Sequence, residues 1–204
     1  MIFNQLFDEK SHTYTYIISS GKGREALIID PVLEKTNSYV EILKTLDLKL
    51  VKVIDTHIHA DHVSGLNELN KHTNCARVMG DKSPSEVIDI RVKDNEKIKI
   101  ENIELTSIYT PGHTECSYSF LMNDRVFTGD TLLIKGSGRT DFQQGNALRQ
   151  YNSLFTKILT YSDKTIVYPG HDYQGRIQST IGEEKKYNPI LQINNAQEYA
   201  KIID

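Results

Sequence analysis

THIHADH, residues 56–62, places four metal-ligand side chains in one short loop, directly after the apolar run LVKVI at 50–54. His57 and His59 are two residues apart, and in an extended chain such side chains point the same way, so both can face one point. Asp61 and His62 follow where the chain turns toward an expected helix, and they face a neighbouring point. Imidazole and carboxylate groups are common metal ligands, so this loop predicts a metal site.

Three further loops each present one more ligand-type side chain at the end of an expected strand. These are His113 in TPGHTECS (110–117), Asp130 in TGDT (128–131) and His171 in YPGHDY (168–173). Loops held on a rigid sheet are where catalytic residues usually lie. Five of the seven histidines occupy these loops, and we assign no role to His12 and His72.

The periodicity of the chain predicts many short strands and fewer helices. Strands are expected at 13–18, 26–30, 50–54, 76–80, 97–100, 103–109, 117–122, 125–129 and 165–169, and helices at 38–48, 62–72, 147–160, 179–187 and 194–203. Ser38 followed by Glu41 predicts a helix cap, and Asn123-Asp124 predicts a hairpin turn. This order favours sheets covered by helices on their outer faces. A doubly wound parallel sheet is the alternative, but the hairpin-like strands argue against it.

The composition bounds the class of protein. The 204 residues suit one domain, 1–204, and the net charge of −3 offers no basic face for nucleic acid. No apolar run approaches the roughly 20 residues of a membrane span. The start, MIFNQLFDEK, lacks the pattern of a secretory signal, so we expect a cytoplasmic protein. Cys75 and Cys116 fit a reducing compartment and are expected to be small buried hydrophobic residues.

The loop motifs together resemble the metallo-β-lactamase superfamily over nearly the whole chain. The resemblance implies an α+β protein, an αββα sandwich with its metal site at one edge. GRTDFQQG (138–145), YPGHDYQG (168–175) and EEKKYNP (183–189) are similar to the persulfide dioxygenase (sulfur dioxygenase) branch of that superfamily. GRTDFQQG is long and unusual, which makes this resemblance specific.

The branch implies one Fe(2+) per chain, held by His57, His113 and Asp130, which would also be the catalytic residues. Two neutral imidazoles and one carboxylate on one face of an octahedral ion leave three positions open for O2 and a substrate thiolate. The remaining ligand-type residues would orient the ligands, or would hold a second metal ion in a hydrolase. These are His59, Asp61, His62 and His171. Their spacing is compatible with both roles.

The activity implied is oxidation of a low-molecular-weight persulfide, glutathione persulfide or a similar one, by O2 to sulfite and the free thiol. The alternative is a glyoxalase II-like hydroxyacylglutathione (thioester) hydrolase with a two-metal site. A non-catalytic metal or sulfur-carrier module is a third class, which a constellation from four loops disfavours.

Substrate contacts are expected from Arg139 and Tyr173, which follow the metal-loop motifs; the guanidinium could hold a carboxylate of the thiol. Ser137, Cys116 and Ile190 stand where the family commonly has Cys, Gly and a basic residue, which weakens the case for glutathione. The resemblance implies a separate sulfurtransferase (rhodanese) or a sulfide:quinone oxidoreductase as pathway partner, and it leaves room for a homodimer.

Overall fold

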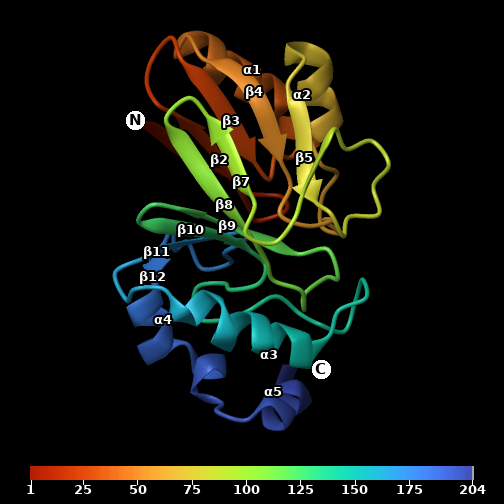
Figure 1. Ribbon diagram of the computed structural model, residues 1–204, viewed down its shortest axis with the longest axis vertical. Helices are drawn as coiled ribbons and strands as arrows, with labels where there is room; N and C mark the ends of the chain where they lie inside the picture. Colours follow the sequence, from red (N-terminus) through yellow and green to blue (C-terminus); the bar gives the residue numbers. More distant parts are fainter. Residues whose placement is uncertain (204) are drawn as a thin grey trace.

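Two six-stranded sheets pack face to face in the computed structural model, which describes residues 1–203 (Figure 1). The first sheet runs in the order β1 (Ile2–Asp8), β2 (Thr13–Ser19), β3 (Glu25–Ile29), β4 (Lys49–Ile54), β5 (Ala76–Gly80) and β6 (Ile90–Val92). The second runs β12 (Ser179–Thr180), β11 (Ile166–Pro169), β10 (Arg125–Gly129), β9 (Tyr118–Met122), β8 (Ile103–Tyr109) and β7 (Lys97–Ile100).

Helices cover the outer face of each sheet (Figure 1). The first sheet carries α1 (Thr36–Thr45) and α2 (Leu66–Thr73), and the second carries α3 (Ala147–Thr156), α4 (Ile181–Tyr187) and α5 (Ala196–Ile203). Short 3-10 helices lie at Leu33–Lys35, Ile158–Thr160 and Pro189–Gln192. The αββα sandwich implied by the resemblance is therefore confirmed.

Both sheets mix parallel and antiparallel pairs. Strands β1 to β3 pair antiparallel and β3 to β6 pair parallel, with α1 as the crossover between β3 and β4. In the second sheet only the pair of β10 with β11 is parallel. A doubly wound parallel sheet is wrong for this chain, because tight hairpins such as Asn123-Asp124 between β9 and β10 can join only antiparallel strands.

The core between the sheets is aromatic and aliphatic. Strand β2 is buried along its whole length, with Tyr16 and Ile18 facing Phe127 and Tyr168 of the second sheet. Each fully buried side chain of this size stabilises the fold by about 1.5–3 kcal/mol. Smaller apolar clusters lie beneath the helices on each outer face. Cys75 and Cys116 are buried and unpaired, as expected.

Several boundaries differ from the sequence prediction. Strands β1 and β6 were not predicted, since β1 mixes polar and apolar residues and β6 has only three residues. The predicted cap at Ser38 is wrong, because a 3-10 turn runs directly into α1 and Lys35 precedes the helix without a side-chain cap. Helix α2 begins at Leu66 rather than at residue 62, because the preceding residues belong to the loop that carries THIHADH. The predicted helix at 147–160 ends at Thr156, and residues 179–180 form β12 ahead of α4.

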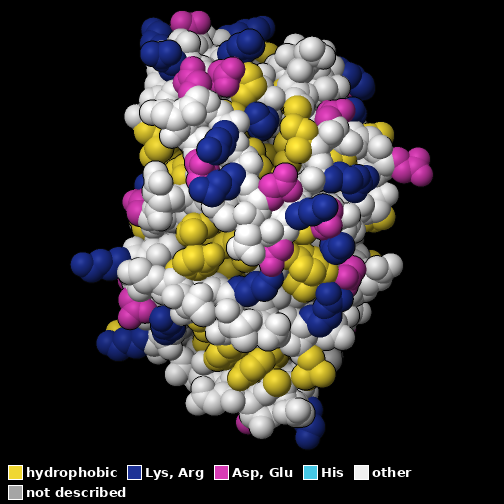
Figure 2. Space-filling view, in the orientation of Figure 1, with side chains coloured by type: hydrophobic (Ala, Val, Ile, Leu, Met, Phe, Trp, Pro, Cys, Tyr) yellow, Lys and Arg dark blue, Asp and Glu magenta, His cyan; other side chains and the backbone are white. Residues whose placement is uncertain are grey.

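Charged side chains of both signs are interspersed with small apolar patches on the face shown in Figure 2, and no histidine is visible on that face. The histidine cluster therefore opens in another direction. Within residues 1–203, no helix has the length and the apolar character needed to cross a membrane.

Candidate metal centre

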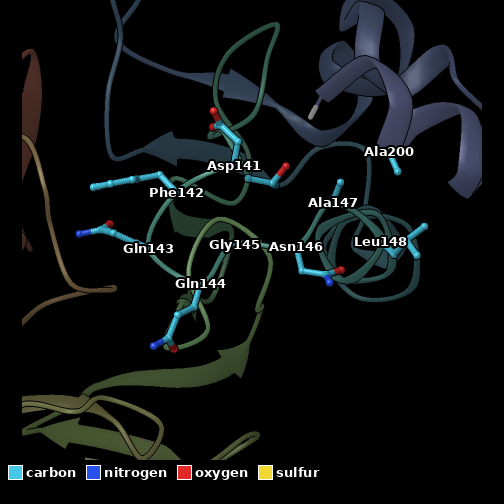
Figure 3. A pocket seen from close by; sticks show the side chains of 10 residues that line it. Asp141, Phe142, Gln143, Gln144, Gly145, Asn146, Ala147, Leu148 and Ala200 are labelled. Carbon is cyan, nitrogen blue, oxygen red and sulfur yellow. The ribbon is translucent and has the colours of Figure 1, made fainter.

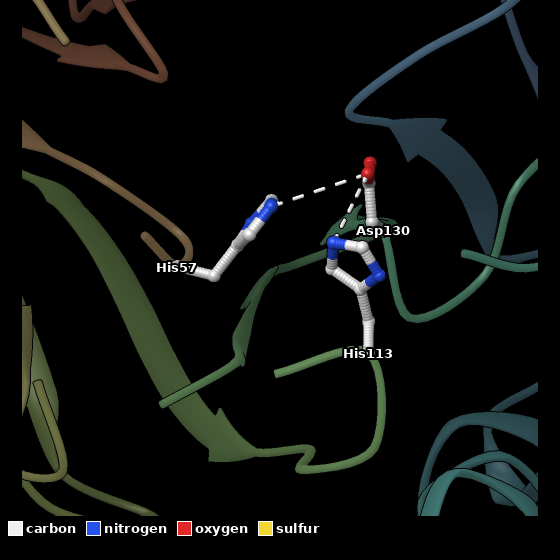
Figure 4. A group of neighbouring side chains, drawn as sticks. All are labelled: His57, His113 and Asp130. Atoms are coloured by element: carbon white, nitrogen blue, oxygen red, sulfur yellow. Dashed lines mark ion pairs between the residues drawn. The ribbon is translucent and has the colours of Figure 1, made fainter. Parts of the chain in front are cut away.

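Loops at one end of the two sheets bring His57, His113 and Asp130 together. His57 follows β4, His113 follows β8 and Asp130 follows β10. Asp130 Oδ2 lies 3.9 Å from His57 Nε2 and 3.6 Å from His113 Nε2 (Figure 4). One ligand atom from each residue lies within 4.8 Å of the others, so these three residues, the triad, could hold one metal ion.

Neighbouring groups orient both imidazoles so that Nε2 faces the carboxylate. Thr56 Oγ1 donates to Asp30 Oδ2 over 2.9 Å, so it accepts from His57 Nδ1 at 2.8 Å. His113 Nδ1 donates to the backbone carbonyl of Arg139 over 2.7 Å. Each ring therefore has its lone pair on Nε2, directed toward Asp130, which is the arrangement that metal-binding histidines show.

Asp130 is held in the same way. Its Oδ1 accepts from His171 Nδ1 over 2.7 Å, which leaves Oδ2 for the two histidines. Gly170 allows this close approach, because a Cβ there would stand 2.5 Å from Asp130 Oδ1. Gly138 is needed for the same reason, since its Cβ would stand 2.8 Å from His113 Nδ1. The donor set and its supports fit a bound cation.

The other four predicted ligand-type residues lie beside the triad and bond mainly to each other and to carboxylates. His59 Nε2 lies 3.3 Å from Asp30 Oδ1 and 3.9 Å from Asp55 Oδ1. Asp61 Oδ2 lies 2.7 Å from His62 Nδ1 and 2.9 Å from His171 Nε2. Two further residue sets could hold an ion, His59 with Asp61 and His62, and Asp30 with Asp55 and His59. Among the described residues, His171 belongs to no such set.

The surroundings of the cluster shift the pKa values of two triad residues in favour of the forms that bind a metal. Burial, together with the neighbouring histidines, holds the pKa of His57 well below its usual value. Burial works against ionisation of Asp130, but His171, His57 and His113 outweigh it and lower the pKa of that carboxyl. Burial also opposes the charged form of His171, yet Asp130 and Asp61 raise its pKa to about 11. A neutral His57 and an ionised Asp130 are the forms that bind a cation.

Within residues 1–203, three buried side-chain atoms have no hydrogen-bond partner: Asp55 Oδ1, His59 Nδ1 and His62 Nε2. Buried polar groups are normally paired. All three residues border one cavity of about 360 Å³ behind the HIHADH loop.

A second cavity, of about 370 Å³, opens over the triad and is lined by both predicted substrate-contact residues. The Arg139 guanidinium is bound by Asp141 at 2.6 and 2.7 Å, and its side chain is 64% exposed. Tyr173 is 67% exposed and its ring lies 5.1 Å from that of His12. His12, which had no predicted role, therefore supports the rim of this cavity.

The GRTDFQQG loop separates the cavity over the triad from a larger cavity of about 580 Å³ beside α3 and α5. Phe142 and Gln143 line both cavities, and Figure 3 shows their side chains directed away from Leu148 and Ala200. Gln143 and Gln144 both have positive φ angles, 49° and 60°. Such strained backbone is common at functional sites.

Sequence reasoning missed four residues that support the cluster: Thr13, Asp30, Asp55 and Thr56. Asp30 and Asp55 directly follow β3 and β4, so the strand-end rule that found Asp130 would also have found them. Thr13 carried no comparable signal, because it is one of several hydroxyl residues in a run that reads as strand.

Comparison with known proteins places this site in a family. A profile of the metallo-β-lactamase superfamily matches residues 9–97 and 80–171. The mouse (Mus musculus) protein named persulfide dioxygenase ETHE1, mitochondrial, is 39% identical over a match covering 100% of this chain and 81% of that protein. The crystal structure of ETHE1 from Myxococcus xanthus has a TM-score of 0.97 at 43% identity, covering 100% of this chain and 90% of that one.

Hydroxyacylglutathione hydrolases are also related, but more distantly. The protein of that name from Dictyostelium discoideum is 32% identical over a match covering 78% of this chain and 62% of that protein. Both identity and coverage are therefore higher for the proteins named persulfide dioxygenase.

Proposed function

Because this chain belongs to the metallo-β-lactamase superfamily and, within it, to the ETHE1 persulfide dioxygenase family, we propose that it oxidises a low-molecular-weight thiol persulfide with O2. One persulfide, one O2 and one water give the free thiol and sulfite. The observation that carries this proposal is the similarity to ETHE1 proteins along the whole chain. It supports the dioxygenase over the thioester hydrolase.

The proposed cofactor is one iron(II) ion per chain, held by His57, His113 and Asp130. When bound there, iron(II) supplies redox chemistry and open coordination positions for dioxygen and a sulfur anion. The protein's part is to hold the ligands and position the substrate. Thr56 and the Arg139 carbonyl orient the two imidazoles, and His171 orients the carboxylate.

The remaining ligand-type residues are proposed to support the triad rather than to hold a second ion. His171 bridges Asp130 and Asp61 through its two nitrogens, and both carboxylates accept, so both nitrogens donate. A ring that donates from both nitrogens has no lone pair for a metal. His59, between Asp30 and Asp55, balances the charge of two buried carboxylates.

The thiol part of the substrate is proposed to lie in the cavity lined by Arg139 and Tyr173. The guanidinium already binds Asp141, so a substrate carboxylate would share or displace that partner. The exposed Tyr173 ring can cover the apolar part of the thiol carrier.

The domain organisation, oligomeric state, location and pathway partners are also proposals. We propose that residues 1–204 act as one domain and assemble as a homodimer in the cytoplasm. A separate sulfurtransferase (rhodanese) or a sulfide:quinone oxidoreductase would supply the persulfide. The related mouse protein is named mitochondrial, a location that belongs to that protein.

Oxygen uptake tests the activity. The chain is reconstituted anaerobically with Fe²⁺ and given glutathione persulfide or coenzyme A persulfide in an oxygen electrode, with sulfite measured in parallel. We expect sulfite to appear in step with oxygen loss. Zn²⁺-loaded protein is the control, because Zn²⁺ is redox-inactive and cannot support the reaction. Anaerobic cleavage of S-lactoylglutathione, with no oxygen uptake on either persulfide, would instead establish the hydrolase.

A further inference from the structure

Two separate loops determine how His113 is placed, and one buried residue of α3, Gln150, contacts both of them. His113 itself belongs to the TPGH turn at 110–113, whereas the carbonyl that accepts from its ring belongs to Arg139, 26 positions further along the chain. Gln150 is only 1% exposed. It meets the turn through its backbone and the second loop through its side-chain amide.

The turn that carries His113 packs directly on the backbone of α3. A Cβ on Gly112 would stand 2.3 Å from the Cα of Gln150, so only glycine permits this approach. The carbonyl of Gly112 also accepts from the N–H of Asn146, the residue that caps α3, over 2.7 Å. Helix α3 therefore fixes the backbone from which the His113 side chain extends.

The amide of Gln150 fixes the loop that orients the His113 ring. Its Nε2 donates to the carbonyl of Gly138 over 2.9 Å, and the next carbonyl along the chain, that of Arg139, accepts from His113 Nδ1 over 2.7 Å. The N–H of Gly138 donates to the carbonyl of Asp130 over 2.8 Å. The two carbonyls lie on neighbouring rigid peptide planes joined at Arg139, so fixing the first restricts the position of the second.

Helix α5 holds the Gln150 amide in this orientation. The hydroxyl of Tyr199, a completely buried residue, donates to Gln150 Oε1 over 3.0 Å, which leaves the amide nitrogen to face Gly138. Ser137 Oγ lies 3.2 Å from the same hydroxyl. Because a tyrosine hydroxyl has one proton, Ser137 is the donor in this second bond. The oxygen and the nitrogen of the amide therefore each have a partner, and these partners fix its direction.

We propose that Gln150 is a positioning residue for the metal ligand His113, and that Tyr199 of α5 acts on the same ligand through Gln150. The proposal rests on the proposed function, from which it takes the triad of His57, His113 and Asp130 as the metal ligands. Groups that orient a metal ligand typically contribute about 10–100-fold to metal affinity. Gln150 acts through a backbone segment rather than on the ring itself, so the lower end of that range is expected.

Zn²⁺ and Co²⁺ alone are the probes, so the test does not depend on oxygen chemistry. Gln150→Met keeps the length of the side chain and removes both of its hydrogen bonds. In competition with a chelator it should bind Zn²⁺ about tenfold more weakly than the wild type. It should also change the visible spectrum of bound Co²⁺, which reports the geometry of the ligands. Tyr199→Phe should weaken Zn²⁺ binding by a smaller factor, because the bond from Gln150 to Gly138 remains.

Ile158→Ala is the control for a general loss of stability. Ile158 follows α3 and is completely buried in the same apolar cluster as Tyr199. Its truncation leaves a cavity and should lower Tm, yet Zn²⁺ affinity and the Co²⁺ spectrum should stay at their wild-type values. Wild-type affinity and spectrum in Gln150→Met, or an equal loss of affinity in Ile158→Ala, overturns the proposal.

Tyr199→Phe keeps the proposal testable if a thermal melt shows that Gln150→Met does not fold. Unchanged Zn²⁺ affinity and Co²⁺ spectrum in Tyr199→Phe would then overturn it, and beside a weakened Gln150→Met they would overturn the part that concerns α5. A wild type that binds metal as expected, but takes up no oxygen with either persulfide when loaded with iron, would remove the dioxygenase function and leave this proposal standing.

Discussion

His171 donates from Nδ1 to Oδ1 of Asp130 over 2.7 Å, and this bond leaves one oxygen of the carboxylate, Oδ2, to face the two histidines of the triad. The link joins a residue that follows β11 to one that follows β10, so the parallel pairing of these strands is what brings the two side chains together. The geometry of Asp130 therefore depends on a residue that is not itself expected to touch the metal.

Asp130→Ala should abolish activity and release the metal while the fold survives. Asp130 is the only anionic member of the proposed ligand set, and its side chain packs against loops rather than against the core between the sheets. Iron content and a thermal melt are measured on the same sample. Asp141→Ala is the matched control, since that exposed carboxylate pairs with Arg139 and is not part of the triad. Wild-type iron loading in Asp130→Ala would contradict the assignment.

His171→Gln should weaken iron binding about 10–100-fold, as is typical when a group that orients a metal ligand is lost. The amide carries both of its N–H donors on one nitrogen, so it cannot reproduce the two oppositely placed donors with which the ring bridges Asp130 and Asp61. Competition against a chelator measures the affinity. Asp61→Asn should act in the same direction but less strongly, because it is one bond further from the triad. Unchanged affinity in both variants would mean that His171 does not orient Asp130.

Arg139→Ala should raise KM for a carboxylate-bearing persulfide more than it lowers kcat, the result expected when uniform binding is lost. Iron content should stay at the wild-type level, because the group that holds His113 is the backbone carbonyl of residue 139. Asp141→Asn releases the guanidinium from its ion pair and should lower KM for the same substrate. Lost iron with an unchanged KM in Arg139→Ala would assign the arginine a structural role.

Tyr199→Phe should destabilise the fold by about 1–3 kcal/mol, since it leaves a buried partner without its hydrogen bond. The Tyr199 hydroxyl donates to Gln150 Oε1 over 3.0 Å, and Gln150 Nε2 donates to the carbonyl of Gly138 over 2.9 Å. This chain connects α5 to the loop that carries Arg139. Urea unfolding measures the loss. Tyr187→Phe, on an exposed side chain, is the control and should change little.

The same variant should also change the response to alkali. Burial raises the pKa of Tyr199 to about 12, from an ordinary value of 10.0. Between these values the unfolded chain loses the proton first, so the free energy of unfolding falls as pH rises from 10 toward 12. Tyr199→Phe removes this contribution, so the difference in stability between wild type and variant should shrink over that range. A difference that stays constant with pH would contradict the burial of an ionisable hydroxyl there.

Local chemistry in the sequence was enough to predict sheets covered by helices and to find the ligand-type residues, and the resemblance to the metallo-β-lactamase superfamily implied the αββα sandwich. Motifs such as HIHADH and GDT combine a strand end, a turn and a ligand within a few residues, so neighbouring positions alone reveal them. The short strands with hairpin turns also argued correctly against a purely parallel sheet. Strands β1 and β6 escaped prediction, because their pairing partners and not their own residues make them strands.

Only the tertiary structure decided which side chains of the cluster face one another and which support them. By itself the sequence predicted that His59, Asp61, His62 and His171 lie near a metal site, but their spacing was compatible with ligands or with supports. The contact of Thr13 with His171 spans 158 positions along the chain, and hydrogen bonds depend on distances of a few tenths of an ångström. Such distances are set by the packing of the two sheets, a non-local property that no single stretch of sequence encodes.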